Sequence, residues 1–252
     1  MRLLFTDLDG CLLNKQDYDY TPSLPVLDEL RRLQIPVILC SSKTYAEMSQ
    51  LQQELQLTDY PMTCENGGLI AWSADPKTHD ILGAKREEIL VLLKQLKPEF
   101  PFRSFADLGL QGVMEATSLP EESAAKAIQR GCTEPLLWDG EDDQIIDFGC
   151  QLQRAGFTLT KGGRFWHVAG KTTKGLAMSK VIERYQQQAA QVLTAAVGDS
   201  PIDQSMLDVA DCPIGIPQPD RQLLVKIPAS TGIIAGIPGS AGWAEAVKKW
   251  LS

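Results

Sequence analysis

The first fourteen residues constrain the fold and chemistry of this chain more than any other stretch. Residues 2–6 form a short apolar run, typical of a strand in the middle of a parallel sheet. Asp7 and Asp9 follow one residue apart, and Gly10 comes next. Side chains at positions i and i+2 of an extended segment point the same way, so both carboxylates project from the carboxyl edge of that strand. Open α/β sheets bind ligands at that edge, so we predict a site there.

The spacing of these carboxylates favours metal-assisted phosphoryl transfer. Two like charges so close cost free energy unless a cation or proton lies between them, and Mg²⁺ accepts such hard oxygen ligands. We expect Asp7 to attack phosphorus and form an aspartyl-phosphate. Asp9 would protonate the leaving oxygen and later activate water, and Gly10 would let the backbone approach the phosphate closely. The alternative is a strand that ends in a solvated, aspartate-rich turn.

Composition limits the class of partner. At 252 residues and 44% hydrophobic, the chain can form one large domain or two smaller ones around a sizeable core. Its formal charge of -8 argues against nucleic acid, because nucleic-acid binders are usually basic. No apolar run approaches the ~20 residues of a membrane span, and the apolar start is too short for a signal peptide. We expect a small-molecule partner, no nucleic acid and no membrane, and the oligomeric state stays open.

The six cysteines show neither a C-x-x-C pair nor a metal-like spacing. Several lie in apolar, strand-like runs, which favours reduced, buried thiols in a cytoplasmic protein over disulfides.

A second strand is expected over residues 36–40, and it ends in hydroxyl and ammonium groups. Ser41, Ser42 and Lys43 follow it and would suit a phosphate. Because strand and helix alternate, this strand is expected to run parallel to the first, which puts Ser41 on the same edge as Asp7. Thr44 then begins a capping box that opens the next helix.

A third strand, over residues 61–64, leads into Glu65, Asn66 and two glycines, a sequence typical of a tight turn. The pattern changes after residue 78. Between residues 79 and 169 we expect helices over 85–96 and 142–155, and a third helix that a capping box at 118–121 opens. We expect a loop over 105–112 and a strand over 135–138. A hairpin is expected over 157–168, with its turn at 161–163.

The predicted organisation is a catalytic core made of residues 1–78 and 170–252, with an inserted α+β cap of residues 79–169. Within the cap, Arg164 is the preferred substrate-binding candidate, because its guanidinium fork suits a carboxylate or phosphate. His167 is equally consistent with a structural and a functional role.

The core resumes with Lys174 at the start of an amphipathic helix, where its ammonium and the positive helix end would both favour a phosphate. Lys171 is a rival three residues earlier. A further strand over 192–197 runs into Asp199 and Asp203. With Asp7 and Asp9, the latter through its backbone carbonyl, these carboxylates would form a Mg²⁺ site.

Four segments, in chain order, resemble the motifs of the haloacid dehalogenase-like hydrolases, most of which are Mg²⁺-dependent phosphatases. They are the segment that starts at Asp7, Ser41, the Lys174–Gly175 pair and the segment over 198–203. The resemblance implies an α/β fold, with a Rossmann-like parallel-sheet core and a type IIB cap. It also implies phosphoryl binding by Ser41 and Lys174, with Asn66 near the substrate. Ile202 departs from the pattern, because asparagine is usual there, and an expected hydrogen bond behind the metal is lost.

Two cap segments, over 130–138 and 164–167, resemble the mannosyl-3-phosphoglycerate phosphatases, although Thr133 stands where serine is usual. This resemblance implies a substrate with a phosphate, a carboxylate and a sugar. We expect Arg164 and Lys43 to bind the carboxylate, and Asn66 and Glu65 to bind sugar hydroxyls.

Other functions stay open. The first alternative is another sugar-phosphate phosphatase, acting on sucrose phosphate, glucosyl-3-phosphoglycerate or a hexose phosphate. A phosphomutase would retain the phosphoryl group and need a bisphosphate activator. A non-enzymatic binding module would be expected to lack Asp7 or Asp9, and both are present.

Overall fold

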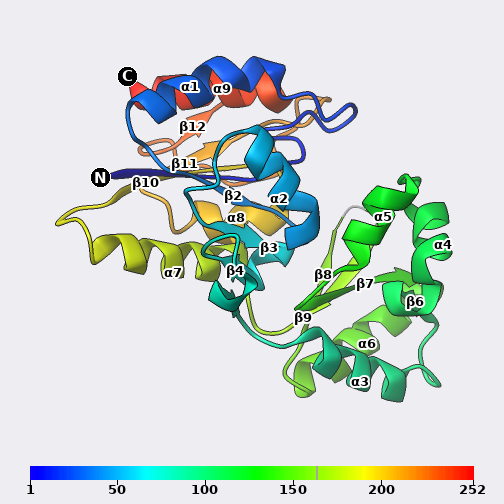
Figure 1. The fold of residues 1–252 in the computed structure, drawn as a ribbon. Helices are drawn as coiled ribbons and strands as arrows, with labels where there is room; N and C mark the ends of the chain where they lie inside the picture. The colour runs from blue at the N-terminus through cyan, green and yellow to red at the C-terminus, as the bar shows by residue number, and fades with distance from the viewer. Residues whose placement is uncertain (163) are drawn as a thin grey trace.

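Two sheets organise the chain in the computed structural model, which describes residues 1–162 and 164–252. Gly163, part of the predicted hairpin turn, lies outside the described residues. Figure 1 shows an α/β body that contains both termini, and a smaller α+β body formed by the middle of the chain.

The larger sheet has eight strands in the order β12-β11-β10-β1-β2-β3-β4-β5. The strands from β12 to β3 are parallel, whereas β4 and β5 pair antiparallel. Their bounds are β1 (Arg2–Thr6), β2 (Val37–Cys40), β3 (Met62–Cys64), β4 (Leu69–Ala71), β5 (His79–Ile81), β10 (Leu193–Gly198), β11 (Cys212–Gly215) and β12 (Ile233–Ile234). The predicted central position of the first strand is confirmed.

Helices cover both faces of this sheet (Figure 1). Alternate residues of β1 separate the two cores: Leu4 packs with α1 (Leu24–Arg32), α2 (Tyr45–Glu54) and α9 (Gly239–Leu251). Leu3 and Phe5 pack instead with α7 (Lys174–Gln186) and α8 (Gln204–Leu207). Burial on both faces explains why these strands read as continuous apolar runs in the sequence.

The register of the parallel strands determines which residues lie next to one another at the carboxyl edge of the larger sheet. Thr6, the last residue of β1, pairs with Val197 in β10 and Leu39 in β2. Cys40, the last residue of β2, pairs with Thr63 in β3. The residues that follow these four strands therefore emerge side by side on one edge of the sheet.

The smaller sheet is antiparallel, in the order β6-β7-β9-β8. Its strands are β6 (Phe102–Ser104), β7 (Thr133–Trp138), β8 (Thr158–Lys161) and β9 (Trp166–Ala169). Helices α3 (Arg86–Leu96) and α6 (Asp142–Arg154) pack on one face through an apolar cluster that includes Phe148 and Val168. Because side chains alternate along a strand, His167 lies on the opposite face, toward the larger body.

Two expectations for this region are wrong. The segment over 105–112 is not a loop but the start of α4 (Phe105–Thr117), which Ser104 and Asp107 open with a capping box. Gly109, with φ +61°, interrupts the helical geometry and accounts for the irregular sequence pattern. No capping box opens α5 (Glu121–Ile128) at Ser118, because Ser118 ends α4 in the left-handed conformation, with φ +62°.

The cysteines are all free among the described residues. Cys11, Cys40, Cys64 and Cys132 are buried, whereas Cys150 is exposed, so the expected burial does not extend to it. Within the described part of the chain, no helix combines the length and apolar character needed to cross a membrane.

Candidate active site

The predicted nucleophile, Asp7, is buried and paired with a lysine. Its backbone N–H donates to the carbonyl of Val197 (2.9 Å), which fixes where its side chain leaves the sheet. Lys174 Nζ lies 2.7 Å from Asp7 Oδ1 and 2.6 Å from Asp203 Oδ1, and the Lys174 side chain is 2% exposed. Burial alone lowers the pKa of Lys174, but the Asp203 and Asp7 carboxylates outweigh it and hold that pKa well above its usual value. Lys174 is therefore a permanent ammonium between the Asp7 and Asp203 side chains.

A local helix cap puts Lys174 in this position. Thr173 Oγ1 accepts a hydrogen bond from the N–H of Leu176 (3.1 Å), so α7 begins at Lys174. Lys171 precedes the cap and is exposed. The structure brings Lys174, and not Lys171, to the end of β1.

Both oxygens of Asp203 already have partners in the protein. Oδ1 accepts from Lys174, while Oδ2 accepts from the backbone N–H of Ser200 (3.1 Å), the Ser200 hydroxyl (2.8 Å) and the N–H of Asp199 (3.2 Å). These bonds fold the loop after β10 and orient both the lysine and Asp199. The predicted direct contact between Asp203 and a metal stays a prediction.

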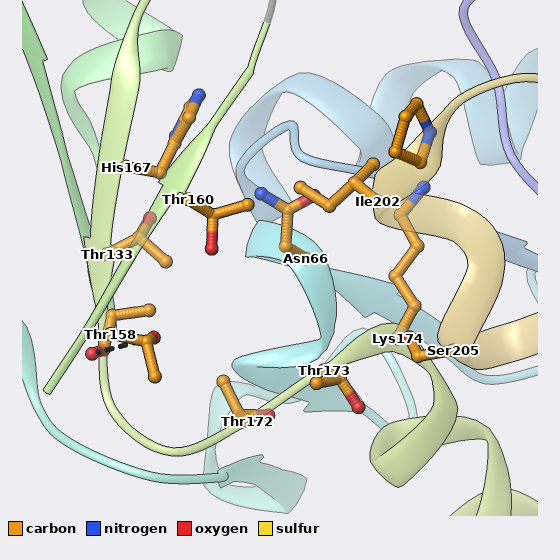
Figure 2. Close-up of a pocket in the computed structure, with 12 residues that line it drawn as sticks. Asn66, Thr133, Thr158, Thr160, His167, Thr172, Thr173, Lys174, Ile202 and Ser205 are labelled. Carbon is orange, nitrogen blue, oxygen red and sulfur yellow. Dashed lines mark hydrogen bonds between the residues drawn. The ribbon is translucent and has the colours of Figure 1, made fainter. Parts of the chain in front are cut away.

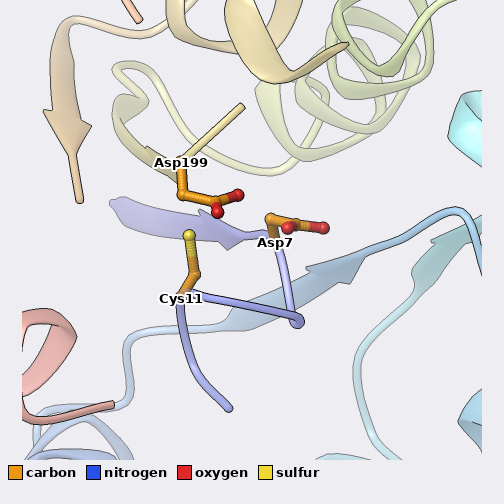
Figure 3. A group of neighbouring side chains, drawn as sticks. All are labelled: Asp7, Cys11 and Asp199. Carbon is orange, nitrogen blue, oxygen red and sulfur yellow. The ribbon is translucent and has the colours of Figure 1, made fainter. Parts of the chain in front are cut away.

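Asp7 and Asp199 lie close enough to share a cation (Figure 3). One carboxylate oxygen from each, together with the Cys11 sulfur, lie within 4.8 Å of one another. Burial raises the pKa of Asp7 to about 8 against the opposing effect of Lys174, and the Asp203, Asp199 and Asp9 charges add to the rise.

The raised pKa values of these buried carboxylates indicate whether the site suits Mg²⁺. Burial and Asp203 also raise the pKa of Asp199, so both carboxylates are ionised only at a cost in free energy. A divalent cation would remove that cost, and carboxylate oxygens are the ligands that Mg²⁺ prefers. Burial raises the pKa of Cys11 well above its usual value, which keeps it a neutral thiol. The residues present fit a hard cation held by Asp7 and Asp199.

Asp9 stands beside this pair at the mouth of the site. Its Oδ2 lies 2.7 Å from Lys43 Nζ, and its Oδ1 is buried with no hydrogen-bond partner among the described residues. Ser41, the residue directly after β2, is 1% exposed, and its hydroxyl accepts from the N–H of Lys43 (3.3 Å). It is not among the described residues that line the cleft between the two bodies. Ser42 lines the cleft. The structure therefore gathers the predicted phosphate-binding segment next to both N-terminal carboxylates.

Gly10 is required by space as well as by backbone conformation. Its φ is +92°, a region that favours glycine, and a Cβ there would lie 2.4 Å from Asp199 Oδ2. The glycine lets the loop after β1 pass directly against the Asp199 carboxylate.

Glu65 holds the smaller body through both of its carboxylate oxygens and is buried. It is 1% exposed. Its Oε1 accepts from the N–H of Gly131 (2.7 Å), and its Oε2 accepts from the N–H of Cys132 (3.2 Å) and the hydroxyl of Thr133 (2.6 Å). The predicted contact between Glu65 and sugar hydroxyls has no support in this geometry.

Arg130 extends this attachment to the loop that follows β2, a role that sequence reasoning missed. Its Nε lies 3.7 Å from Glu65 Oε2 and donates to Thr133 Oγ1 (2.8 Å), while its Nη2 donates to the carbonyl of Ser42 (2.7 Å). Residues 130–133 stood out in the sequence only through a family resemblance. Their partners in the core could not be identified from spacing.

Replacing Glu65 by alanine should destabilise the protein by about 3–5 kcal/mol, because Arg130 would keep a buried charge without its partner. Urea denaturation measures the free energy of unfolding. The matched control is Glu245→Ala, which removes an exposed i,i+4 pair with Lys249 and should cost less than about 1 kcal/mol. A loss for Glu65→Ala as small as in the control would show that Glu65 does not anchor the cap.

The cleft between the two bodies has a volume of about 380 Å³. Among the described residues, Asp7, Asp9, Asn66 and Lys174 line it from the core, and Lys161, Gly162 and His167 line it from the smaller body. Arg164 is not among them. It is exposed, and its guanidinium donates to the carbonyl of Ala116.

Lys161, which sequence reasoning did not single out, is the cation that the smaller body brings to the cleft. It ends β8, just before the turn of the hairpin, and its Nζ lies 4.7 Å from the centre of the Trp166 ring. A strand that ends in lysine before paired glycines is the signal that could have found it.

A buried aspartate, paired with lysine beside a second aspartate at the edge of a parallel sheet, is the arrangement expected of an enzyme that transfers phosphoryl groups. The comparisons agree. The model of a haloacid dehalogenase-like hydrolase family matches residues 4–115. A glucosyl-3-phosphoglycerate/mannosyl-3-phosphoglycerate phosphatase of Persephonella marina is 34% identical, over 99% of this chain and 97% of the relative. The chain belongs to the haloacid dehalogenase-like hydrolases, in the family of these phosphatases.

Solved structures support the fold. A protein of Thermoplasma acidophilum superposes with a TM-score of 0.73 at 15% identity, covering 100% of this chain and 98% of its own. A sugar phosphatase of subclass IIB of the superfamily gives 0.67 at 14% identity, with 99% of each chain covered. The predicted α/β fold, the predicted family and the phosphatase class are confirmed.

Proposed function

We propose that this protein is a Mg²⁺-dependent phosphatase of mannosyl-3-phosphoglycerate, glucosyl-3-phosphoglycerate, or both. The observation that carries the proposal is one cleft that joins two sets of groups. The core supplies an aspartate nucleophile held by Lys174, and the smaller body supplies the Lys161 ammonium opposite. A substrate with a phosphate at one end and a carboxylate at the other matches these charges.

The smaller body acts as a cap in this proposal. The predicted division puts residues 79–169 in the cap, and the core sheet extends a little further, because β5 pairs with β4. The two connections between the bodies pass each other at Gly83 and Gly170, where a Cβ on Gly170 would lie 2.3 Å from the nitrogen of Ala84. We therefore take the cap as residues 83–169.

The mechanism follows from the ion pairs. Asp7 attacks phosphorus through a carboxylate oxygen and forms an aspartyl-phosphate, and Lys174 neutralises the charge that collects beside it. Asp9, positioned by Lys43, acts first in its protonated form and donates that proton to the leaving oxygen as its bond to phosphorus breaks. The resulting carboxylate then takes a proton from the water that attacks the aspartyl-phosphate and releases phosphate from Asp7. Mg²⁺, held by Asp7, Asp199 and the backbone of Asp9, would polarise the phosphoryl oxygens. In this proposal Asp203 orients Lys174 and the Asp199 loop.

Substrate recognition is divided between the two bodies. Ser41, Ser42 and Lys174 would hold the phosphate beside Asp7. Lys161 replaces Arg164 as the proposed carboxylate-binding group, because it lines the cleft and Arg164 faces Ala116. Lys43 is occupied by Asp9. A cytoplasmic location stays a prediction from the cysteine pattern alone.

Metal removal should abolish activity. Phosphate release is measured after exhaustive chelation and again after adding back Mg²⁺, and we expect the loss to be fully reversible. A thermal unfolding series should also show stabilisation by Mg²⁺, of about 2.7 kcal/mol at a hundredfold excess over its Kd. Full activity in chelator would overturn the metal requirement.

The substrate is tested by phosphate release across mannosyl-3-phosphoglycerate, glucosyl-3-phosphoglycerate, sucrose phosphate and hexose phosphates. We expect the two glycosyl-phosphoglycerates to have the highest kcat/KM. A strong preference for a plain hexose phosphate would overturn the substrate and leave the phosphatase mechanism intact.

A further inference from the structure

A second cavity opens from the phosphate cleft, between the cap sheet and the core (Figure 2). Its volume is about 200 Å³, and it shares five lining residues with the cleft that holds Asp7. The shared residues are Asn66, His167, Lys174, Pro201 and Ile202. This volume is below the roughly 300–1,000 Å³ of pockets for drug-sized ligands, so it suits a single ring attached to the phosphorylated part of a substrate.

Most of the residues that line this cavity have polar side chains, and among the described residues none of them carries a free charge. Figure 2 shows Thr133 and Thr160 of the cap strands facing Asn66 of the core. The ammonium of Lys174, which lies at one end, is already bound by two carboxylates. A charged ligand group would have no counter-ion in this cavity, so a neutral group that carries hydroxyls would bind there more favourably.

Two residues that line the cavity each carry a buried polar atom with no partner among the described residues. These atoms are the Oδ1 atom of Asn66 and the Nδ1 atom of His167. Such atoms cost free energy unless a ligand or water satisfies them. Burial, with a smaller effect from Arg130, lowers the pKa of His167 to about 3, so its imidazole is neutral and offers one acceptor and one donor. Both residues are therefore prepared to bond hydroxyl groups.

Ile202 supplies an apolar surface at the junction of the cavity and the cleft. The family resemblance expects asparagine at this position, and the site geometry gives the isoleucine no part in holding the carboxylates. A sugar ring presents C–H groups on its faces and hydroxyls at its edge. An aliphatic side chain beside two hydrogen-bonding residues is complementary to both the C–H faces and the hydroxyl-bearing edge of such a ring.

We propose that this cavity is the subsite for the sugar ring of the substrate, and that His167 and Asn66 read its hydroxyl groups across the aliphatic surface of Ile202. The inference rests on the proposed function, because it assumes a substrate that carries both a sugar and a phosphate. It makes His167 a specificity-determining residue that contacts the part of the substrate farthest from phosphorus.

The experiment compares two substrates that differ only by the sugar: mannosyl-3-phosphoglycerate and 3-phosphoglycerate. His167→Ala should lower kcat/KM roughly tenfold on the glycosylated substrate, as expected for a lost hydrogen bond and an unpaired hydroxyl. The loss of kcat/KM on 3-phosphoglycerate should be much smaller, because that substrate has no sugar for His167 to contact. His167→Asn, which keeps an acceptor near the position of Nδ1, should recover most of the loss. The control is His79→Ala, the other histidine, which lies against Tyr45 away from the cleft.

The inference is tested by comparing how much His167→Ala lowers kcat/KM on each of the two substrates. Equal losses on both, or no loss on either, would show that His167 does not read the sugar. Wild-type preference for hexose 6-phosphate over both phosphoglycerates would instead overturn the proposed function. The subsite would then be tested by measuring the effect of His167→Ala on kcat/KM for hexose 6-phosphate and for glycerol 3-phosphate. The inference still requires a loss on hexose 6-phosphate that is much larger than the loss on glycerol 3-phosphate.

Discussion

Replacing Asp7 by asparagine should abolish turnover and at the same time stabilise the metal-free protein. An amide cannot form the aspartyl-phosphate, and loss of a catalytic nucleophile costs on the order of 10⁴–10⁶-fold in kcat. The side chain is nevertheless a source of instability in the absence of metal, because burial raises its pKa to about 8. Activity and stability should therefore move in opposite directions.

The pH dependence of this stabilisation has a definite sign. An aspartate in the unfolded chain titrates near pH 3.9, so between about pH 4 and pH 8 the folded state holds a proton on Asp7 that the unfolded state has lost. Stability of the wild type falls as pH rises through that window. The asparagine variant lacks this contribution, so its advantage should be larger at pH 8 than at pH 5.

Thermal unfolding in chelator at the two pH values measures the effect, with phosphate release measured in parallel. Asp59→Asn, at an exposed aspartate, is the matched control and should alter neither quantity. Retained turnover in Asp7→Asn would mean that another group attacks phosphorus. A lower unfolding temperature at pH 8 would mean that the ion pair with Lys174 outweighs the cost of burial.

Strand register explains why much of the core site could be predicted from the sequence. Parallel strands bring their carboxyl ends to one edge, so an apolar run followed by polar residues predicts the place of Asp7, Ser41 and Asp199 without any contact information. The start of α7 is local as well, because Thr173 caps it and puts Lys174 first. In each case the deciding physics lies within a few residues along the chain.

The cap site depends on pairings that the local sequence does not contain. Arg164 and Lys161 are three residues apart on a hairpin, and the packing of that hairpin on α4 sends the guanidinium to Ala116 and leaves the lysine at the cleft. Glu65 looks free in the sequence, and only the fold reveals that Gly131, Cys132 and Thr133 bond to it. By contrast, the Ser104–Asp107 capping box was available in the sequence, and the glycine at 109 obscured it.

Lys174→Met should destabilise the protein strongly and also reduce turnover. It removes the ammonium between Asp7 and Asp203, so the carboxylate of Asp203, which is 0% exposed, loses its cationic partner. Breaking a buried pair in this way costs about 3–5 kcal/mol, and turnover should fall with it, because the nucleophile loses its orienting partner. Lys171→Met, three residues earlier and exposed, is the control and should change neither quantity.

The double variant Lys174→Met/Asp203→Asn separates structural from catalytic effects. Removing the charge of Asp203 as well should return most of the lost stability, because the cost comes from a charge left unpaired and not from the absent pair itself. Activity should not return, since Asp7 would still face phosphorus without an ammonium beside it. Urea denaturation and phosphate release on the wild type, the single variant and the double variant measure the two effects. Recovery of turnover along with stability would show that Lys174 only holds the fold together, and the role proposed for it in catalysis would be wrong.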